Sequence, residues 1–134
     1  MKQLLKNALW GLLLFVCVMV AEFLVTLPFT PREGVPTDLT LEFGLTAPLA
    51  LGVSWGLARF LRTTRAQANS RGFVWAIIVL ALYVLIGLGN GTLALFAVWT
   101  FLLLVSAILL GPVVAGRMSD GRPTARRSAG RTTA

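Results

Sequence analysis

The stretch that decides the fold is ALWGLLLFVCVMVAEFLVTLPF, residues 8–29, because it is almost entirely apolar. A helix rises about 1.5 Å per residue and the hydrocarbon core of a bilayer is about 30 Å thick, so a run of this length can cross it. Its only ionisable side chain is the carboxylic acid Glu22. An acid inside a membrane span usually faces the interior of a helix bundle. Glu22 is therefore the first candidate for a functional residue.

Three further apolar runs follow the first one, at residues 43–61, 73–90 and 92–115. The chain has 134 residues and a mean hydropathy of +0.83, which is typical of a small polytopic membrane protein. We therefore predict an all-α membrane domain in residues 1–115, built as an antiparallel bundle of four transmembrane helices. The proline-rich segment after the first run ends that helix, and Asp38 is a favoured N-cap for the second.

A turn sequence and a polar C-terminal segment complete the predicted layout. Gly89-Asn90-Gly91 is turn chemistry, because glycine and asparagine tolerate a positive φ, so the third and fourth spans are expected to form a tight helical hairpin. Residues 116–134 are rich in arginine, serine, threonine, glycine and proline. This segment has little apolar surface to bury, and we predict a disordered basic tail.

The distribution of positive charge predicts the orientation. Eleven of the 12 lysines and arginines lie in the N-terminal segment, in the second connection with its flank, and in the tail. Positive residues are retained on the cytoplasmic side of a membrane, so four spans with both termini in the cytoplasm place only Arg32 outside. The preference for arginine over lysine is typical of a GC-rich genome. The predicted location is the cell membrane of a bacterium.

Arginines recur every third residue where the second helix ends, at Arg59, Arg62 and Arg65. This spacing places them near one face of the helix. Together with Arg71 they either enforce the topology or attract anionic lipid headgroups on the cytoplasmic side. The high positive charge is explained by the membrane surface, and we expect no nucleic-acid partner.

Depth along each span places Tyr83 and Thr100 within about one helical turn of Glu22. Desolvation disfavours the charged form of a carboxyl group in a low-dielectric bundle, so we expect a protonated Glu22 that donates a hydrogen bond to a neighbour such as Tyr83 or Thr100. Three interpretations stay open. The neutral acid holds helices together, or it is a proton or cation site in a transport cycle, or it contacts a partner subunit.

Small residues predict where helices approach closely. Gly52 and Gly56 form a GxxxG pattern in the second span, and Ala107 and Gly111 share the same spacing in the fourth. Such patterns favour helix association in membranes. They do not say whether the contact is within one chain or between chains.

The sequence gives no support for an enzyme. It contains no histidine, which removes the commonest general base and the commonest metal ligand together. No acid–base pair, nucleophile with a base, metal-ligand set or phosphate-binding loop is recognisable. We predict no catalytic residues, no metal and no cofactor.

Ala21-Glu22, in the first of four short spans, resembles the small multidrug resistance exporters. The resemblance covers these two residues and implies that Glu22 binds substrate and protons, as the glutamate in the first helix of those exporters does. The long proline-rich first connection and the arginine-rich tail depart from the compact pattern of that family.

Because so little of the chain lies outside the spans, we expect a non-enzymatic protein that acts through another membrane protein or through copies of itself. The leading hypothesis is an accessory or assembly subunit of a larger membrane complex. The alternative is a small proton-coupled transporter that works as a homo-oligomer through Glu22. A pore-forming lysis or toxin protein is the second alternative.

Overall fold

The computed structural model describes residues 1–29, 38–91 and 93–120, and the regular structure within these ranges is helical. Arg32 and the predicted tail beyond residue 120 lie outside the described residues. The elements in chain order are α1 (Lys2–Thr26), the short 3-10 helix η1 (Leu27–Phe29), α2 (Leu39–Phe60), α3 (Arg65–Asn90), the 3-10 helix η2 (Leu93–Ala97) and α4 (Trp99–Asp120).

The four α-helices are each long and apolar enough to cross a membrane. They have 25, 22, 26 and 22 residues, and at about 1.5 Å per residue each exceeds a hydrocarbon core of about 30 Å. The predicted number of apolar helices long enough to span a membrane is confirmed, and these helices fit a multi-pass membrane protein. The first three helices begin before the predicted apolar runs, and α4 ends after its run, because helix formation does not require apolar residues at the ends.

Two helix ends follow from the local sequence. The carboxylate of Asp38 accepts hydrogen bonds from the backbone N–H groups of Thr40 at 3.0 Å and Leu41 at 3.4 Å, so it caps α2 as predicted. Gly91 ends α3 in the left-handed conformation, at φ +66°. Side chains other than glycine rarely adopt this conformation without strain, which explains the glycine at this position.

The connection between α3 and α4 differs from the predicted tight hairpin. After Gly91 the chain forms η2, and α4 begins at Trp99 instead of residue 92. The aromatic ring of Phe96 in η2 packs edge-on against Phe101 in α4, with ring centroids 5.2 Å apart. This contact accounts for the longer connection, because it turns the apolar segment back against the start of α4.

α4 also ends later than predicted and includes residues 116–120, which we had assigned to the tail. Gly116 lies against α3 so closely that an added Cβ atom would come within 2.8 Å of the Ala68 side chain. The last turns of α4 therefore pack against the start of α3 instead of leaving the bundle.

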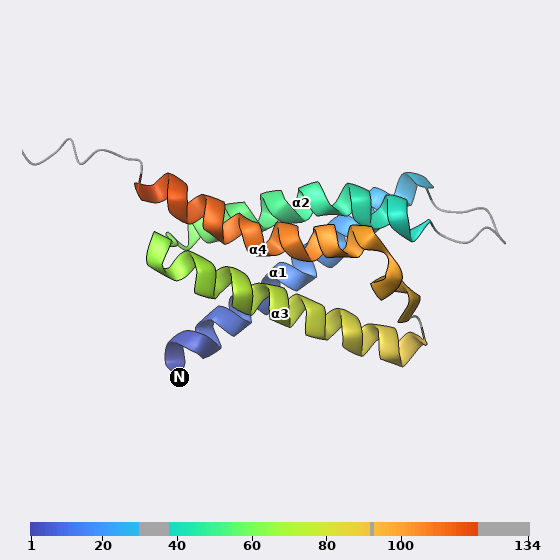
Figure 1. The fold of residues 1–134 in the computed structure, drawn as a ribbon, viewed down its shortest axis with the longest axis horizontal. Helices are drawn as coiled ribbons and strands as arrows, with labels where there is room; N and C mark the ends of the chain where they lie inside the picture. Colours follow the sequence, from blue (N-terminus) through green and yellow to red (C-terminus); the bar gives the residue numbers. More distant parts are fainter. Residues whose placement is uncertain (30–37, 92, 121–134) are drawn as a thin grey trace, which may run out of the picture.

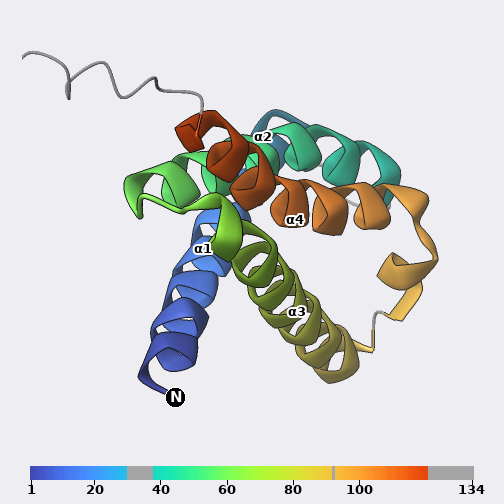
Figure 2. The same ribbon diagram turned by 60° about the vertical axis from the view of Figure 1, so that its left-hand side comes forward.

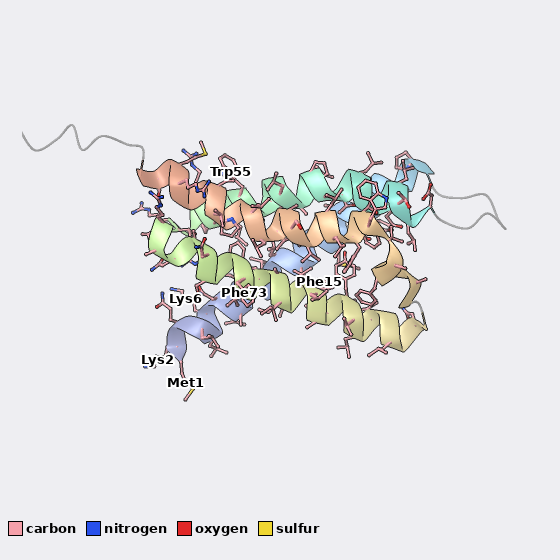
Figure 3. The ribbon with its side chains drawn as sticks, in the orientation of Figure 1. Met1, Lys2, Lys6, Phe15, Trp55 and Phe73 are labelled. Carbon is pink, nitrogen blue, oxygen red and sulfur yellow. The ribbon has the colours of Figure 1, made fainter. Side chains whose placement is uncertain are left out.

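α2 and α4 lie side by side along most of their length, and α3 packs against α4 (Figure 1). α1 packs against α2 and α3 and crosses behind them at an angle, so that its N-terminal part stands away from the α2–α4 pair (Figure 2). Phe15 lies toward the middle of the bundle, whereas Met1, Lys2 and Lys6 lie at the outlying end of α1 (Figure 3). The start of α1, the turn between α2 and α3, and the end of α4 share one end of the molecule, which we call the basic end (Figure 1).

Close helix contacts rest on glycines, but only partly on those that the sequence indicated. At Gly111 an added Cβ atom would come within 2.8 Å of the backbone nitrogen of Trp55, and the hydroxyl of Ser54 donates a 2.8 Å hydrogen bond to the carbonyl of Ile108. Ala107, on the same face of α4, is buried. Gly111 thus lets α2 and α4 approach closely.

The GxxxG pair makes no close helix contact within this chain, so its role in packing stays a prediction for a contact between chains. An added Cβ atom at Gly52 or at Gly56 would meet nothing within 4 Å. The reason is the rotation of α2 about its axis. Ser54 lies on the face of α2 that packs against α4, whereas Gly52 and Gly56 lie on a face that does not contact another helix closely. Two glycines that we did not single out make close contacts instead: Gly72 with the carbonyl of Leu109, and Gly11 with the side chain of Ile78.

Candidate functional site

Four aromatic rings, one from each long helix, meet in the interior of the bundle. They are Phe15 of α1, Phe43 of α2, Tyr83 of α3 and Phe101 of α4, and we call them the aromatic cluster. The ring of Tyr83 is edge-on to all three phenylalanines, with centroid distances of 5.6, 6.2 and 5.3 Å. Each of the four side chains is at most 9% exposed. Tyr83 is therefore the residue at which the four helices converge.

The hydroxyl of Tyr83 donates a hydrogen bond to Oε2 of Glu22 at 2.5 Å. Glu22 is the buried acid of α1, with 8% of its surface exposed. Periodicity explains the meeting, because the buried residues of α1 form one stripe that ends at Glu22. The structure thus brings together two of the three residues that the sequence singled out as an intramembrane polar site.

A second carboxyl group lies near this contact. Glu42, in the first turn of α2, lies close enough to Glu22 for the two carboxyl groups to repel each other when both are ionised. We call Glu22, Glu42 and Tyr83 the glutamate cluster. Two carboxyl groups that interact in this way favour a state in which one of them carries a proton. The arrangement can therefore hold a proton between α1 and α2, with the phenol of Tyr83 as a hydrogen-bond donor to Glu22.

Glu42 is not among the predicted polar residues, because it lies just before the predicted second span at residues 43–61. The sequence nevertheless contains a pattern that indicates an inward position for Glu42. Asp38 caps α2, so Glu42 lies in its first turn, and Thr46 follows it four residues later on the same face. Thr46 is fully buried, and its hydroxyl donates to the backbone carbonyl of Glu42 at 2.8 Å. A polar residue one turn further on the same stripe thus indicates that Glu42 turns inward.

Thr100 is not part of the hydrogen-bonded contact. Its side chain is 2% exposed, and within the described part of the chain its hydroxyl has no hydrogen-bond partner. Its methyl group lies 3.8 Å from the position that a Cβ atom at Gly44 would occupy. Thr100 therefore packs between α4 and α2 at the level of the glutamate cluster and leaves one polar atom unused.

The four arginines of the second connection divide into two kinds. Arg59, Arg62 and Arg65 are exposed. Arg71 is 8% exposed, and its guanidinium donates to the Thr63 hydroxyl at 2.8 Å and to the Leu61 carbonyl at 3.5 Å. Arg71 therefore differs from the three exposed arginines, because its side chain holds the turn between α2 and α3. The predicted role of these arginines in topology or headgroup binding stays a prediction.

No other chemistry stands out in the interior. Among the residues that the structure describes, no three histidine, cysteine, aspartate or glutamate side chains lie close enough together to hold a metal ion. The glutamate cluster has two carboxyl groups and one phenol, which suit proton exchange better than metal coordination.

In comparisons with known proteins, no protein family, no curated protein and no solved structure matches the chain.

Proposed function

We propose that this chain is a small, non-enzymatic subunit of a larger membrane complex, either an accessory or an assembly factor. The observation that supports it is that the other helices cover only a narrow face of α1. The buried residues of α1 form a single narrow stripe, Gly11, Leu14, Phe15, Val18 and Glu22. The rest of α1 exposes large apolar side chains, and its N-terminal part stands away from the α2–α4 pair (Figure 2). This surface of α1 is available to another membrane protein or to a second copy.

The proposal includes an orientation with both termini in the cytoplasm of a bacterial cell. Its support is that Lys2, Lys6, the four arginines of the second connection and Arg117 lie on the segments that meet at the basic end. Asp38 and the glutamate cluster lie toward the opposite end. Antiparallel spans with a cytoplasmic basic end satisfy the positive-inside rule.

Photo-crosslinking in native membranes tests the proposed partner surface. A photoreactive amino acid at Leu13 of α1 is compared with one at Leu103 of α4, because these leucines are 44% and 45% exposed. We expect a discrete protein adduct from position 13 and mainly lipid adducts from position 103. Lipid adducts alone at both positions, together with purification only as a monomer in mild detergent, would contradict the proposal.

A second candidate function, a proton-coupled transporter that works as a homo-oligomer, is favoured by the glutamate cluster. A carboxyl pair that holds one proton between two helices is a group whose contacts change when that proton leaves. The geometry supports a proton step that involves Glu22, Glu42 and Tyr83 together.

Proton uptake into proteoliposomes that contain the full chain, followed with a trapped pH-sensitive dye, tests this second function. If the chain transports protons, Glu22→Gln should abolish uptake, and Glu42→Gln should reduce it. The matched control is Asp38→Asn, which removes a charge near the same end while asparagine can still cap α2. Uptake that is equal in the wild type and in Glu22→Gln would eliminate the transporter.

A further inference from the structure

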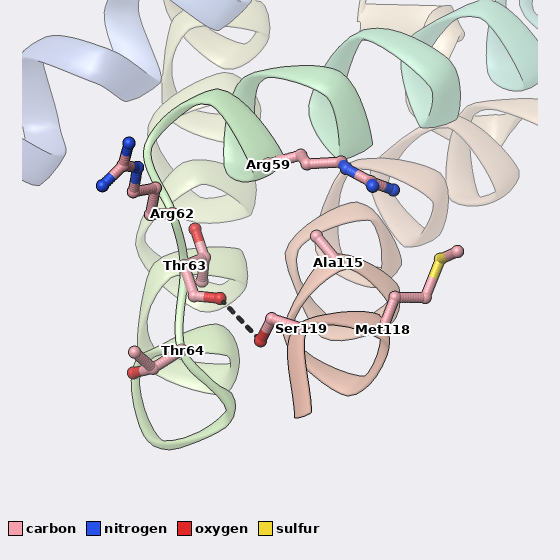
Figure 4. Close-up of a pocket in the computed structure, with 7 residues that line it drawn as sticks. All are labelled: Arg59, Arg62, Thr63, Thr64, Ala115, Met118 and Ser119. Carbon is pink, nitrogen blue, oxygen red and sulfur yellow. Dashed lines mark hydrogen bonds between the residues drawn. The ribbon is translucent and has the colours of Figure 1, made fainter. Parts of the chain in front are cut away.

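A pocket of about 620 Å³ opens at the basic end, between the turn that joins α2 to α3 and the last turns of α4 (Figure 4). Its size lies within the range of about 300–1,000 Å³ that is usual for ligand sites. Two arginines and three residues with hydroxyl groups line it together with two apolar residues. The full set is Arg59, Arg62, Thr63, Thr64, Ala115, Met118 and Ser119.

The wall of this pocket is fixed by hydrogen bonds. The Thr63 hydroxyl donates to the Ala58 carbonyl at 2.7 Å and accepts from the buried Arg71. The Ser119 hydroxyl lies 3.4 Å from the Thr63 carbonyl, which links the turn to α4 (Figure 4). Arg62 has a φ of +50°, the left-handed conformation that is common directly after a helix, and the Thr63 N–H bonds to the Ala58 carbonyl across this end of α2.

An apolar groove of about 330 Å³ adjoins the pocket on the surface of α2 and α4. Met118 lines both the pocket and the groove. The guanidinium of Arg59 lies 5.4 Å from the ring centre of Trp55, which also lines the groove. Gly52 forms part of its floor, and the absence of a side chain there keeps the groove open. A pocket lined by two arginines thus adjoins an apolar groove on the surface of two helices that can cross a membrane.

We propose that this composite surface binds one anionic phospholipid, with the phosphate in the pocket and an acyl chain in the groove. The positive charges of Arg59 and Arg62, which both line the pocket, attract a phosphate. The pocket alone would also suit free inorganic phosphate. The adjoining groove favours a lipid, because free phosphate has no apolar part that would gain from burial there. Basic pockets between membrane helices on the cytoplasmic side commonly bind lipid headgroups.

The test is a titration of the purified full chain in mild detergent, followed by native mass spectrometry, with phosphatidylglycerol, phosphatidylcholine and inorganic phosphate as separate probes. We expect phosphatidylglycerol to bind at least about fivefold more tightly than phosphatidylcholine, since one charge near the membrane surface corresponds to about that factor. We expect inorganic phosphate neither to bind nor to displace the lipid.

Two matched pairs of variants locate the site. Arg59→Gln and Arg62→Gln should each weaken phosphatidylglycerol binding about fivefold, whereas Arg65→Gln, outside the lining set, should leave it unchanged. Gly52→Leu should block the groove, whereas Gly56→Leu adds the same side chain where the structure is equally open but outside the groove. Circular dichroism checks that every variant keeps its helical content.

Three results would overturn the proposal. Equal affinity for phosphatidylglycerol and phosphatidylcholine would show that the charges do not select the headgroup. Equal losses in Arg59→Gln and Arg65→Gln, or in Gly52→Leu and Gly56→Leu, would show binding to the general surface instead of this site. Displacement of the lipid by inorganic phosphate would assign the pocket to a free anion.

Discussion

The two ends of the bundle bury polar groups in opposite ways. At one end, the buried carboxyl group of Glu22 accepts a hydrogen bond from Tyr83, whose ring packs among aromatic rings, and the carboxyl group of Glu42 lies nearby. At the basic end, a buried arginine is satisfied by the hydroxyl and carbonyl groups of a turn, and its neighbouring arginines point to the surroundings. Because Glu22 and Tyr83 bond to each other, a change in the protonation of one affects the other. Arg71 bonds to a turn instead, so it holds that turn in place.

The comparison predicts its largest effect at the convergence of the four helices. Tyr83→Ala removes a ring that packs against Phe15, Phe43 and Phe101 and also removes the donor to Glu22. We expect a loss of about 3–5 kcal/mol in the free energy of unfolding, measured in mixed detergent micelles. The control is Leu85→Ala, because Leu85 lies on the same helix and is 66% exposed. Equal losses in both variants would mean that the convergence at Tyr83 does not stabilise the bundle.

The next effect belongs to the basic end. Arg71→Met keeps most of the side-chain volume and removes the donors to Thr63 and Leu61. We expect a loss of about 1.5–3 kcal/mol, the usual range for hydrogen bonds to a charged group. The turn at residues 61–64 should also become more sensitive to protease. Arg65→Met is the control, because Arg65 is exposed. A turn that is equally protected in Arg71→Met and in the wild type would contradict the role given to Arg71.

A smaller effect separates the ring of Tyr83 from its hydroxyl. Tyr83→Phe keeps the aromatic contacts and removes only the hydrogen bond to Glu22. We expect a loss of about 1–3 kcal/mol, because the carboxyl group remains buried with one donor fewer. The same measurement on the Tyr83→Ala variant shows how much of the total belongs to the ring.

Some features of this fold can be predicted from the sequence, and others cannot. The number of helices and the cap at Asp38 follow from hydropathy and local chemistry, which act over a few residues. Rotation of a helix about its axis depends on its neighbours. For this reason the open faces at Gly52 and Gly56 were not predicted, and neither were the close contacts of Gly11 and Gly72.

The candidate site shows the same limit. Counting residues along each span placed Tyr83 near Glu22, because depth in a membrane is nearly linear in sequence. The same count placed Thr100 near Glu22. Depth does not say on which side of its helix a residue lies, and the Thr100 hydroxyl has no hydrogen bond to the carboxyl group. Glu42 was missed because a boundary set by hydropathy excluded the first turn of α2. The cap at Asp38 predicts the start of α2 better than hydropathy does. Once the first helical residue is known, the buried and exposed faces of the first turn can be assigned.

A double-mutant cycle between Glu22 and Tyr83 tests the central claim most directly, namely that these two side chains join α1 to α3 through one buried contact. The free energy of unfolding is measured for the wild type, Glu22→Ala, Tyr83→Phe and the double variant in the same mixed micelles. We predict a coupling energy of about 1–3 kcal/mol, within the range for residues in direct contact. Additive losses, with a coupling energy indistinguishable from zero, would contradict the account.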